Sequence, residues 1–334
     1  MRLSLLFLAS LIGLSSIAQD EPVGYTVLKD DPHGSRLIKF TLPIWNLTLS
    51  DYNFSALDVV GGIHVVPSKN LYFHAAYRYM IGDQMNNDLP RRDNNTANAA
   101  SIYESTISND LSVEGTYFFK QEDVRKEQRI NLKSQNVGGT RMNYVTYIPA
   151  TMIKSYGIRL GFDRGVTWYN LNKVDVTGTN VFNGSQVAVD NGYKSTFLDY
   201  SIARVGVALS KATNLHVDVK DYGYRTNTGI TLFYADLLIP LSRTYEDVYY
   251  SPVLFFGTYE EIFYEQLNIN DNIKNLPAGL AIGARILPYM GAVGFNAELG
   301  LNPFAGFTGV YSKIGFNFMI GKGQKRLMPR GRKK

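Results

Sequence analysis

Residues 310–320, VYSKIGFNFMI, alternate without a break between two kinds of side chain. Every second position from Val310 is apolar except Ser312, and the positions between them are polar, small or amphipathic. This alternation indicates a β-strand with one apolar and one wetter face, because successive side chains of a strand point to opposite sides. Similar segments recur along the chain, which favours a transmembrane β-barrel whose apolar face meets lipid.

The N-terminus has the features of a secretory signal peptide over residues 1–18. Arg2 supplies the positive start, Leu3 to Leu14 the apolar stretch, and Ser16-Ile17-Ala18 a small-x-small cleavage site. That stretch is too short for a membrane-spanning helix, and no later apolar run is longer, so a helical membrane protein is excluded. We expect an outer-membrane protein after Sec-type export, with a soluble secreted protein as the alternative on these features alone.

Composition supports a barrel. The chain has no cysteine, and a closed barrel needs none because hydrogen bonds between strands tie its backbone together. The absence also removes thiolate zinc sites and a thiol nucleophile. The 23 tyrosines and 18 phenylalanines are typical of aromatic girdles at membrane interfaces, although tyrosine-rich soluble sandwiches share this feature.

The positive charge of the chain belongs to its C-terminal tail. The formal net charge is +5, and loss of Arg2 with the signal peptide leaves +4. Residues 322–334 carry seven basic side chains and no acid, so residues 19–321 carry −3. We therefore expect a mildly acidic body with a basic, unstructured tail.

The hairpin rhythm predicts one all-β domain, a single transmembrane antiparallel barrel of about 14 strands, with 12–16 as the range. A periplasmic lead-in (19–34) precedes the barrel (35–321), and the tail (322–334) follows it. The expected strands lie near 35–46, 54–66, 71–82, 105–119, 128–138, 151–162, 166–175, 193–209, 215–226, 229–241, 248–258, 278–287, 292–301 and 308–320.

The connections predict a sidedness for this barrel. With both termini in the periplasm, the turns at 67–70, 120–127, 210–214 and 288–291 all fall on the periplasmic side. The long polar loops at 83–100, 176–192 and 259–277 fall outside. Short periplasmic turns and long outer loops are typical of bacterial barrels.

The C-terminal stretches 281–302 and 310–321 resemble the closing hairpins of outer-membrane β-barrel proteins of Gram-negative bacteria, a porin-like group. The resemblance implies the architecture and no subfamily. Such barrels commonly end at an aromatic residue, whereas Phe316 and Phe318 lie ahead of the tail. Either an internal assembly signal suffices, or 308–320 is not the closing strand.

Alternation also predicts which polar side chains line the lumen. His64 and His74 face inward on neighbouring strands, close enough for a metal site or a pH-responsive pair, although polar filling of the lumen is the favoured interpretation. His216 lies many strands away. The inward charges are mixed in sign, so strong ion selectivity is not expected. The predicted lumen-lining residues are Asp58, His64, His74, Arg78, Arg159, Asp218, Lys220, Arg285, Glu298 and Lys313, with Arg204 on the same face.

No catalytic set emerges from this arrangement. No histidine maps to the outer rim, and Ser201 and Ser312 have no histidine nearby in the predicted strand order, so a nucleophile would lack its base. We expect no enzyme, no cofactor and no metal.

Two functions remain. The first is a passive pore for small hydrophilic solutes, with inward charges along the path. The second is a scaffold or accessory subunit of an envelope secretion or surface-assembly complex. Its tail would dock to a periplasmic or envelope partner, and export makes nucleic acid an improbable one. The predicted docking residues are Lys325, Arg326, Arg330, Arg332, Lys333 and Lys334.

Overall fold

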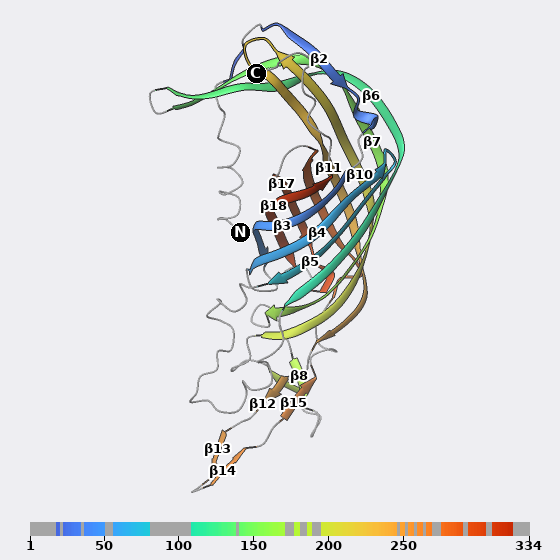
Figure 1. Cartoon of the computed structure of the whole chain (residues 1–334). Helices are drawn as coiled ribbons and strands as arrows, with labels where there is room; N and C mark the ends of the chain where they lie inside the picture. The colour runs from blue at the N-terminus through green and yellow to red at the C-terminus, as the bar shows by residue number, and fades with distance from the viewer. Residues whose placement is uncertain are drawn as a thin grey trace.

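A computed structural model of the whole chain defines the fold (Figure 1). It describes residues 18–20, 23–34, 37–50, 56–80, 108–137, 140–170, 177–180, 186–188, 195–245, 248–250, 253–256, 259–262, 265–268, 275–289, 293–304 and 309–322. Among these residues no helix is long and apolar enough to cross a membrane.

Ten antiparallel strands form a closed barrel. Neighbours in sequence pair with one another around the wall, and two further pairings, β18 with β3 and β7 with β10, complete the ring. The alternating C-terminal stretch is therefore the strand that closes the barrel, β18, which pairs with β3. The barrel strands are β3 (Leu37–Ser50), β4 (Ala56–Ser68), β5 (Leu71–Met80), β6 (Asn109–Val137), β7 (Thr140–Asn170), β10 (Ser195–Val219), β11 (Gly223–Tyr245), β16 (Gly279–Pro288), β17 (Val293–Leu301) and β18 (Val310–Lys322).

The expected count of about 14 strands is too high. The expected strands at 105–119 and 128–138 overlap the single strand β6, and those at 151–162 and 166–175 overlap β7. The three strands expected over 193–241 are the two long strands β10 and β11. The segment expected at 248–258 holds β12 (Val248–Tyr250) and β13 (Val253–Phe256), which pair outside the barrel.

The turns predicted at 120–127 and 210–214 from their composition are wrong. Both segments continue as strand, and a β-bulge between Phe118 and Lys120 marks only a shift of register in β6. The chain instead reverses at 220–222, where Asp221 has φ 67° and Gly223 φ 72°. A positive φ suits glycine and, among other residues, aspartate, so this tight turn has a local cause.

The two ends of the barrel differ. One rim, here the turn-side rim, carries the short connections β4–β5 and β16–β17, the start of β3 and the end of β18, and the short connections β6–β7 and β10–β11 lie beyond it on the same side. The other, the loop-side rim, carries the long connections, as expected. Two of these pair into a small sheet of order β12-β15-β8-β9, with β13–β14 as a separate ribbon (Figure 1, below the barrel). The sheet also contains β8 (Thr177–Asn180), β9 (Gln186–Ala188) and β15 (Glu265–Asn268), and the ribbon contains β14 (Tyr259–Ile262).

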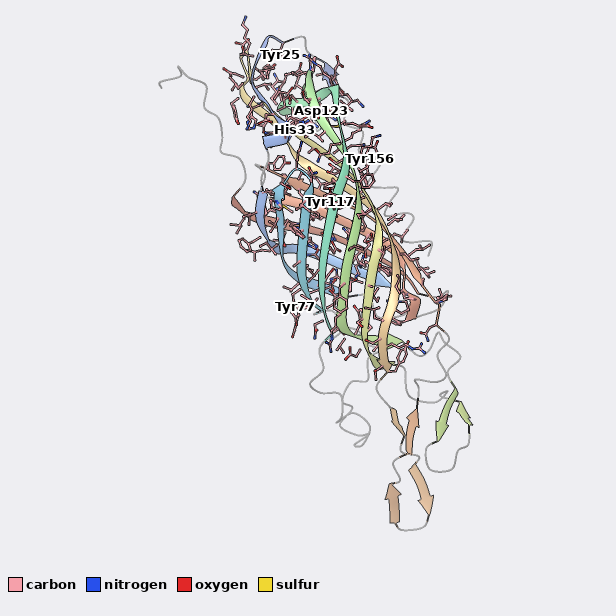
Figure 2. All side chains as sticks on the ribbon, turned by 90° about the vertical axis from the view of Figure 1, so that its right-hand side faces the viewer. Tyr25, His33, Tyr77, Tyr117, Asp123 and Tyr156 are labelled. Atoms are coloured by element: carbon pink, nitrogen blue, oxygen red, sulfur yellow. The ribbon has the colours of Figure 1, made fainter. Side chains whose placement is uncertain are left out.

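An apolar belt encircles the barrel wall. On β18 the even positions Phe316, Phe318 and Ile320 are exposed while Tyr311 and Met319 are buried inside, as the alternation predicts. Figure 2 shows Tyr77, Tyr117 and Tyr156 on the outer wall, and Tyr25 and Asp123 beyond the belt. Further exposed apolar side chains of the belt are Phe40, Leu42, Val59, Phe73, Val113, Ile158, Leu160, Phe162, Val205, Val207, Phe233, Leu237, Ile282, Ile286, Val293 and Leu299.

Four strands continue far beyond the belt on the turn side. β7 has 31 residues, about 100 Å at a strand's usual rise, whereas a transmembrane strand needs about 9–11 residues. β5 stops pairing with β6 at Tyr117, and β16 stops pairing with β11 at Gly229. The ends of β6, β7, β10 and β11 therefore leave the wall as two ribbons (Figure 1, top).

These ribbons form a second hydrophobic core. Ile130 and Leu132 from β6, Ile148 and Ala150 from β7, and Leu215, Val217 and Val219 from β10 are fully or almost fully buried together. The core residues from β7 and β10 lie on the same side of their strands as the side chains that face outward in the belt. That side becomes protein interior because one ribbon crosses the other, with the Arg225 guanidinium donating to the Leu132 carbonyl at 2.7 Å. We call this unit the β-sandwich.

The N-terminal lead-in completes the β-sandwich. β2 (Tyr25–Asp30) pairs with β10 at 215–219, where β7 has left it, and β1 (Ala18–Asp20) pairs in parallel with β7. The Asp30 carboxylate accepts hydrogen bonds from the Thr151 backbone N–H and hydroxyl, both at 2.9 Å. The short 3-10 helix η1 (Pro32–Gly34) then leads the chain into the barrel.

Candidate functional site

The centre of the barrel lumen holds a buried ion-pair network built around Glu114 on β6. Its carboxylate pairs with Arg159 of β7 at 2.6 Å and with Arg285 of β16 through both guanidinium Nη atoms, one of them at 3.0 Å. Arg159 also donates to Asp236 of β11 at 2.9 Å. Charged side chains from four strands of the wall thus meet inside the lumen, because the long arginine side chains reach into it.

A second group of ion pairs surrounds Arg204 on β10. Its guanidinium donates to Asp163 at 2.6 Å and to Glu298 at 2.9 and 3.2 Å. The hydroxyls of Tyr234 and Tyr311 donate to Glu298 at 2.7 and 2.8 Å. Both oxygens of this carboxylate are therefore saturated with donors, which is what a buried charge needs.

A third group holds residues from β4, β5 and β6 together. Arg78 donates to Asp110 at 3.1 Å and lies 3.5 Å from Asp58. Thr48 donates to Asp58 at 2.5 Å, and Lys313 of β18 lies 4.0 Å from Asp110. Charged side chains thus link the closing strand β18 to β6 through the lumen.

The ring of Tyr234 lies beside two arginines of this network. The Arg159 guanidinium lies 3.9 Å from the ring centroid of Tyr234, and that of Arg285 lies 5.2 Å from the same centroid. A cation above a ring face is stabilised by the ring quadrupole, most strongly where water is excluded.

The network is close to neutral. Among the described residues it combines six carboxylates with the five bases Arg78, Arg159, Arg204, Arg285 and Lys313, a formal charge of −1. Most of these groups line a cavity of about 70 Å³, room for a few water molecules. The carboxylates are Asp58, Asp110, Glu114, Asp163, Asp236 and Glu298.

A layer of mainly apolar side chains lies in the lumen between this network and the turn-side rim. It contains Leu37, Tyr72, Phe118, Leu232 and Tyr289, all buried. The cavity next to it has a volume of about 30 Å³, and Pro32 of η1 helps to line it. The lead-in therefore lies over the turn-side end of the apolar layer.

His64 and His74 meet as the sequence predicts. Their rings stack with centroids 4.4 Å apart. The Tyr72 hydroxyl lies 2.8 Å from His64 Nδ1, and His74 Nδ1 lies 3.2 Å from Glu114. Within the described part of the chain no group of three or more His, Cys, Asp or Glu side chains is arranged to hold a metal ion.

Most predicted lumen residues join the network, but Asp218 and Lys220 do not. Both lie at the β10–β11 turn of the β-sandwich, because β10 runs on past the barrel wall. His216 is buried there too, 2.6 Å from the Tyr224 hydroxyl and 2.8 Å from Asn214. Those placed in the lumen are Asp58, His64, His74, Arg78, Arg159, Arg204, Arg285, Glu298 and Lys313.

The sequence interpretation missed four carboxylates of the network: Asp110, Glu114, Asp163 and Asp236. The signal was present in each strand. Asp110 and Glu114 alternate with Leu111 and Val113, as the inward face of a half-apolar strand requires. Counting acids on these faces would have shown that the arginines are neutralised within the lumen.

The predicted docking residues of the tail, Lys325 to Lys334, lie outside the described residues. So does the outer loop at 83–100.

Comparison with known proteins adds little. No protein-family model matches the chain, and no curated protein does. A solved structure of a double mutant of the Rh. blastica porin aligns with 89% of this chain and 100% of its own, at 9% identity and a TM-score of 0.17. A score this low carries no argument about fold or function, so the interpretation rests on the geometry.

Proposed function

We propose that the chain is an outer-membrane scaffold: a non-conducting β-barrel that holds the β-sandwich in the periplasm for a protein partner. The observation that carries this proposal is the filled lumen. Charged side chains that would line the path of a pore are instead paired with one another. Between them and the turn-side rim, buried side chains that are mainly apolar fill the lumen.

The apolar belt supports the membrane location. Leu160 and Val207 are 59% and 61% exposed on the outer wall, as lipid contact requires and water does not favour. Beyond the belt the outward face of β6 turns charged at Lys120 and Glu122. The signal peptide expected from the sequence supports export to the outer membrane.

The β-sandwich supports a role outside the membrane. A plain barrel turns with short hairpins at the membrane surface and needs no strand residues beyond the belt. Here they build a unit with its own core, and the lead-in is part of it. The basic tail leaves the barrel on the same side, since β18 ends at the turn-side rim, and we propose that it joins in docking.

The edges of the β-sandwich differ in a way that supports a partner strand. Beyond its last pairing with β5, the edge of β6 carries Lys120, Glu122, Asp123, Arg125, Lys126 and Glu127, charges that discourage strand addition. The first four residues of β2 carry no charge, and Tyr25 and Val27 are each 43% exposed. An extended partner segment fits such an edge through main-chain hydrogen bonds.

Single-channel conductance of the mature protein in a planar bilayer tests the proposal. We expect no conductance from a barrel that has folded. Heat-modifiable gel mobility shows that it has folded. A steady conductance proportional to salt would overturn the scaffold and support the passive pore for small solutes.

Photo-crosslinking tests the partner. A photoreactive residue at Val27 should trap a periplasmic protein in cells, whereas the same residue at Leu160, on the lipid-facing belt, should not. Deletion of 323–334 should weaken the captured complex and leave conductance unchanged. Equal labelling at both positions would refute a specific docking edge.

A further inference from the structure

Three lysines gather on the outer wall where the apolar belt ends on the turn side. Lys120, Lys154 and Lys211 come from the adjacent strands β6, β7 and β10, and all face outward. Lys120 lies in one row with Tyr156 and Leu209, and Lys154 and Lys211 lie one row further from the belt. The lysines therefore lie at the level where lipid headgroups meet the barrel proposed above.

The strand register places two of these charges side by side. Lys154 pairs directly with Lys211 across the β7–β10 ladder. On its other side Lys154 pairs with Glu122, whose carboxylate also lies 2.7 Å from Lys120 Nζ. Three lysines and one glutamate carry +2. Like charges directly opposite each other on a sheet destabilise it, so a bound anion would relieve this pair.

The surroundings suit a lipid rather than a free ion. The Lys120 and Lys211 ammonium groups each lie 5.6 Å from a ring centroid, of Tyr156 and Phe233 respectively. Rings of this kind hold headgroup-level positions at membrane interfaces. From them the exposed side chains of Ile158 and Val207 lead down the wall, an apolar track for acyl chains.

The β-sandwich bounds the same place from the other side. Leu215 enters the sandwich core two pairs beyond Thr213, and Asn227, opposite Leu215, donates to the Gln128 side chain of the crossing ribbon. Lys211 therefore lies between the crossing ribbon and the belt.

We propose that Lys154 and Lys211, assisted by Lys120, bind the phosphate of an anionic phospholipid from the turn-side leaflet. The inference rests on the membrane location proposed above. The bound headgroup fixes the depth of the barrel and neutralises the charge at the root of the β-sandwich. Glu122 holds the Lys120 ammonium group at 2.7 Å beside this pair.

Native mass spectrometry tests this site with the full mature protein in mild detergent, titrated with phosphatidylglycerol or phosphatidylethanolamine. The double variant Lys154→Gln with Lys211→Gln should bind phosphatidylglycerol about 30-fold more weakly, since each lysine near an anionic lipid contributes about fivefold. The charge-matched control, Lys126→Gln with Lys220→Gln, removes two exposed lysines of the β-sandwich and should bind as the wild type does.

The outcomes separate the two proposals. Equal affinities of both double variants, or equal affinity of the wild type for the two lipids, would overturn the lipid site while a folded, membrane-inserted barrel leaves the proposed function standing. A wild-type chain that fails to insert into bilayers would instead overturn the membrane location. Heat-modifiable mobility of each variant shows that it has folded.

Discussion

Removal of the central negative charge of the lumen is the sharpest test of the filled barrel. Glu114→Gln keeps the size of the side chain but takes the carboxylate away from Arg159 and Arg285. Both guanidinium groups are buried, with Arg159 at 0% exposure, so neither can turn to water. The new amide also places an N–H donor against donors.

The expected loss of stability follows from these contacts. Breaking a buried ion pair by removing one partner costs about 3–5 kcal/mol, because the remaining charge stays desolvated. Two arginines depend on Glu114, and Asp236 still compensates one of them, which keeps the estimate in that range. The unfolding equilibrium constant should therefore rise by about two to nearly four orders of magnitude.

Urea unfolding of the refolded barrel in lipid vesicles measures this change. The matched control is Glu122→Gln, the same substitution at an exposed pair with Lys120, which should leave the midpoint unchanged within error. A double-mutant cycle with Arg285→Gln should show strong positive coupling, because the second substitution removes one orphaned charge. If Glu114→Gln unfolds at the same urea concentration as Glu122→Gln, the network does not seal the lumen as argued.

Three further predictions follow from the same structure. Phe118→Ala should open a measurable conductance by thinning the apolar layer, while Phe119→Ala, on the outer wall, should stay silent in the same planar bilayer. Gly157→Ala should cost about 1–3 kcal/mol in urea unfolding, because its Cβ would press on the Tyr117 carbonyl, whereas Gly61→Ala meets nothing within 4 Å and should be neutral. Leu215→Ala should cost the β-sandwich about 2–5 kcal/mol and speed its tryptic cleavage; unchanged cleavage would argue against a separate core.

The face of each strand was predictable because it depends only on local backbone geometry. Period-2 alternation placed Asp58 and His64 inside and Val59 outside, and all three lie there. It also brought His64 next to His74, since a short turn sets the register between β4 and β5. These features need no knowledge of distant parts of the chain.

Strand length was not predictable in the same way. Nothing in the alternation of β7 shows where the apolar belt ends, and the charged run 120–127 has the composition of a turn although β6 continues through it. A strand keeps its hydrogen-bonded ladder when it passes from lipid into water, so only the polarity of its outward face changes. From the sequence, this change of polarity is interpreted as a chain reversal, and too many strands are therefore predicted.

The sequence alone determined the all-β barrel class, the inward and outward faces of the strands within the barrel wall, and the end of the barrel that carries the long connections, because these depend on local periodicity and loop length. Only the tertiary structure decided that the barrel has ten strands, that the lumen charges neutralise one another, and that the outward faces of β7 and β10 end in a second core. Those outcomes depend on which strands meet across the ring. Arg159 and Glu298 are 139 positions apart in the chain and belong to one network only once the sheet closes.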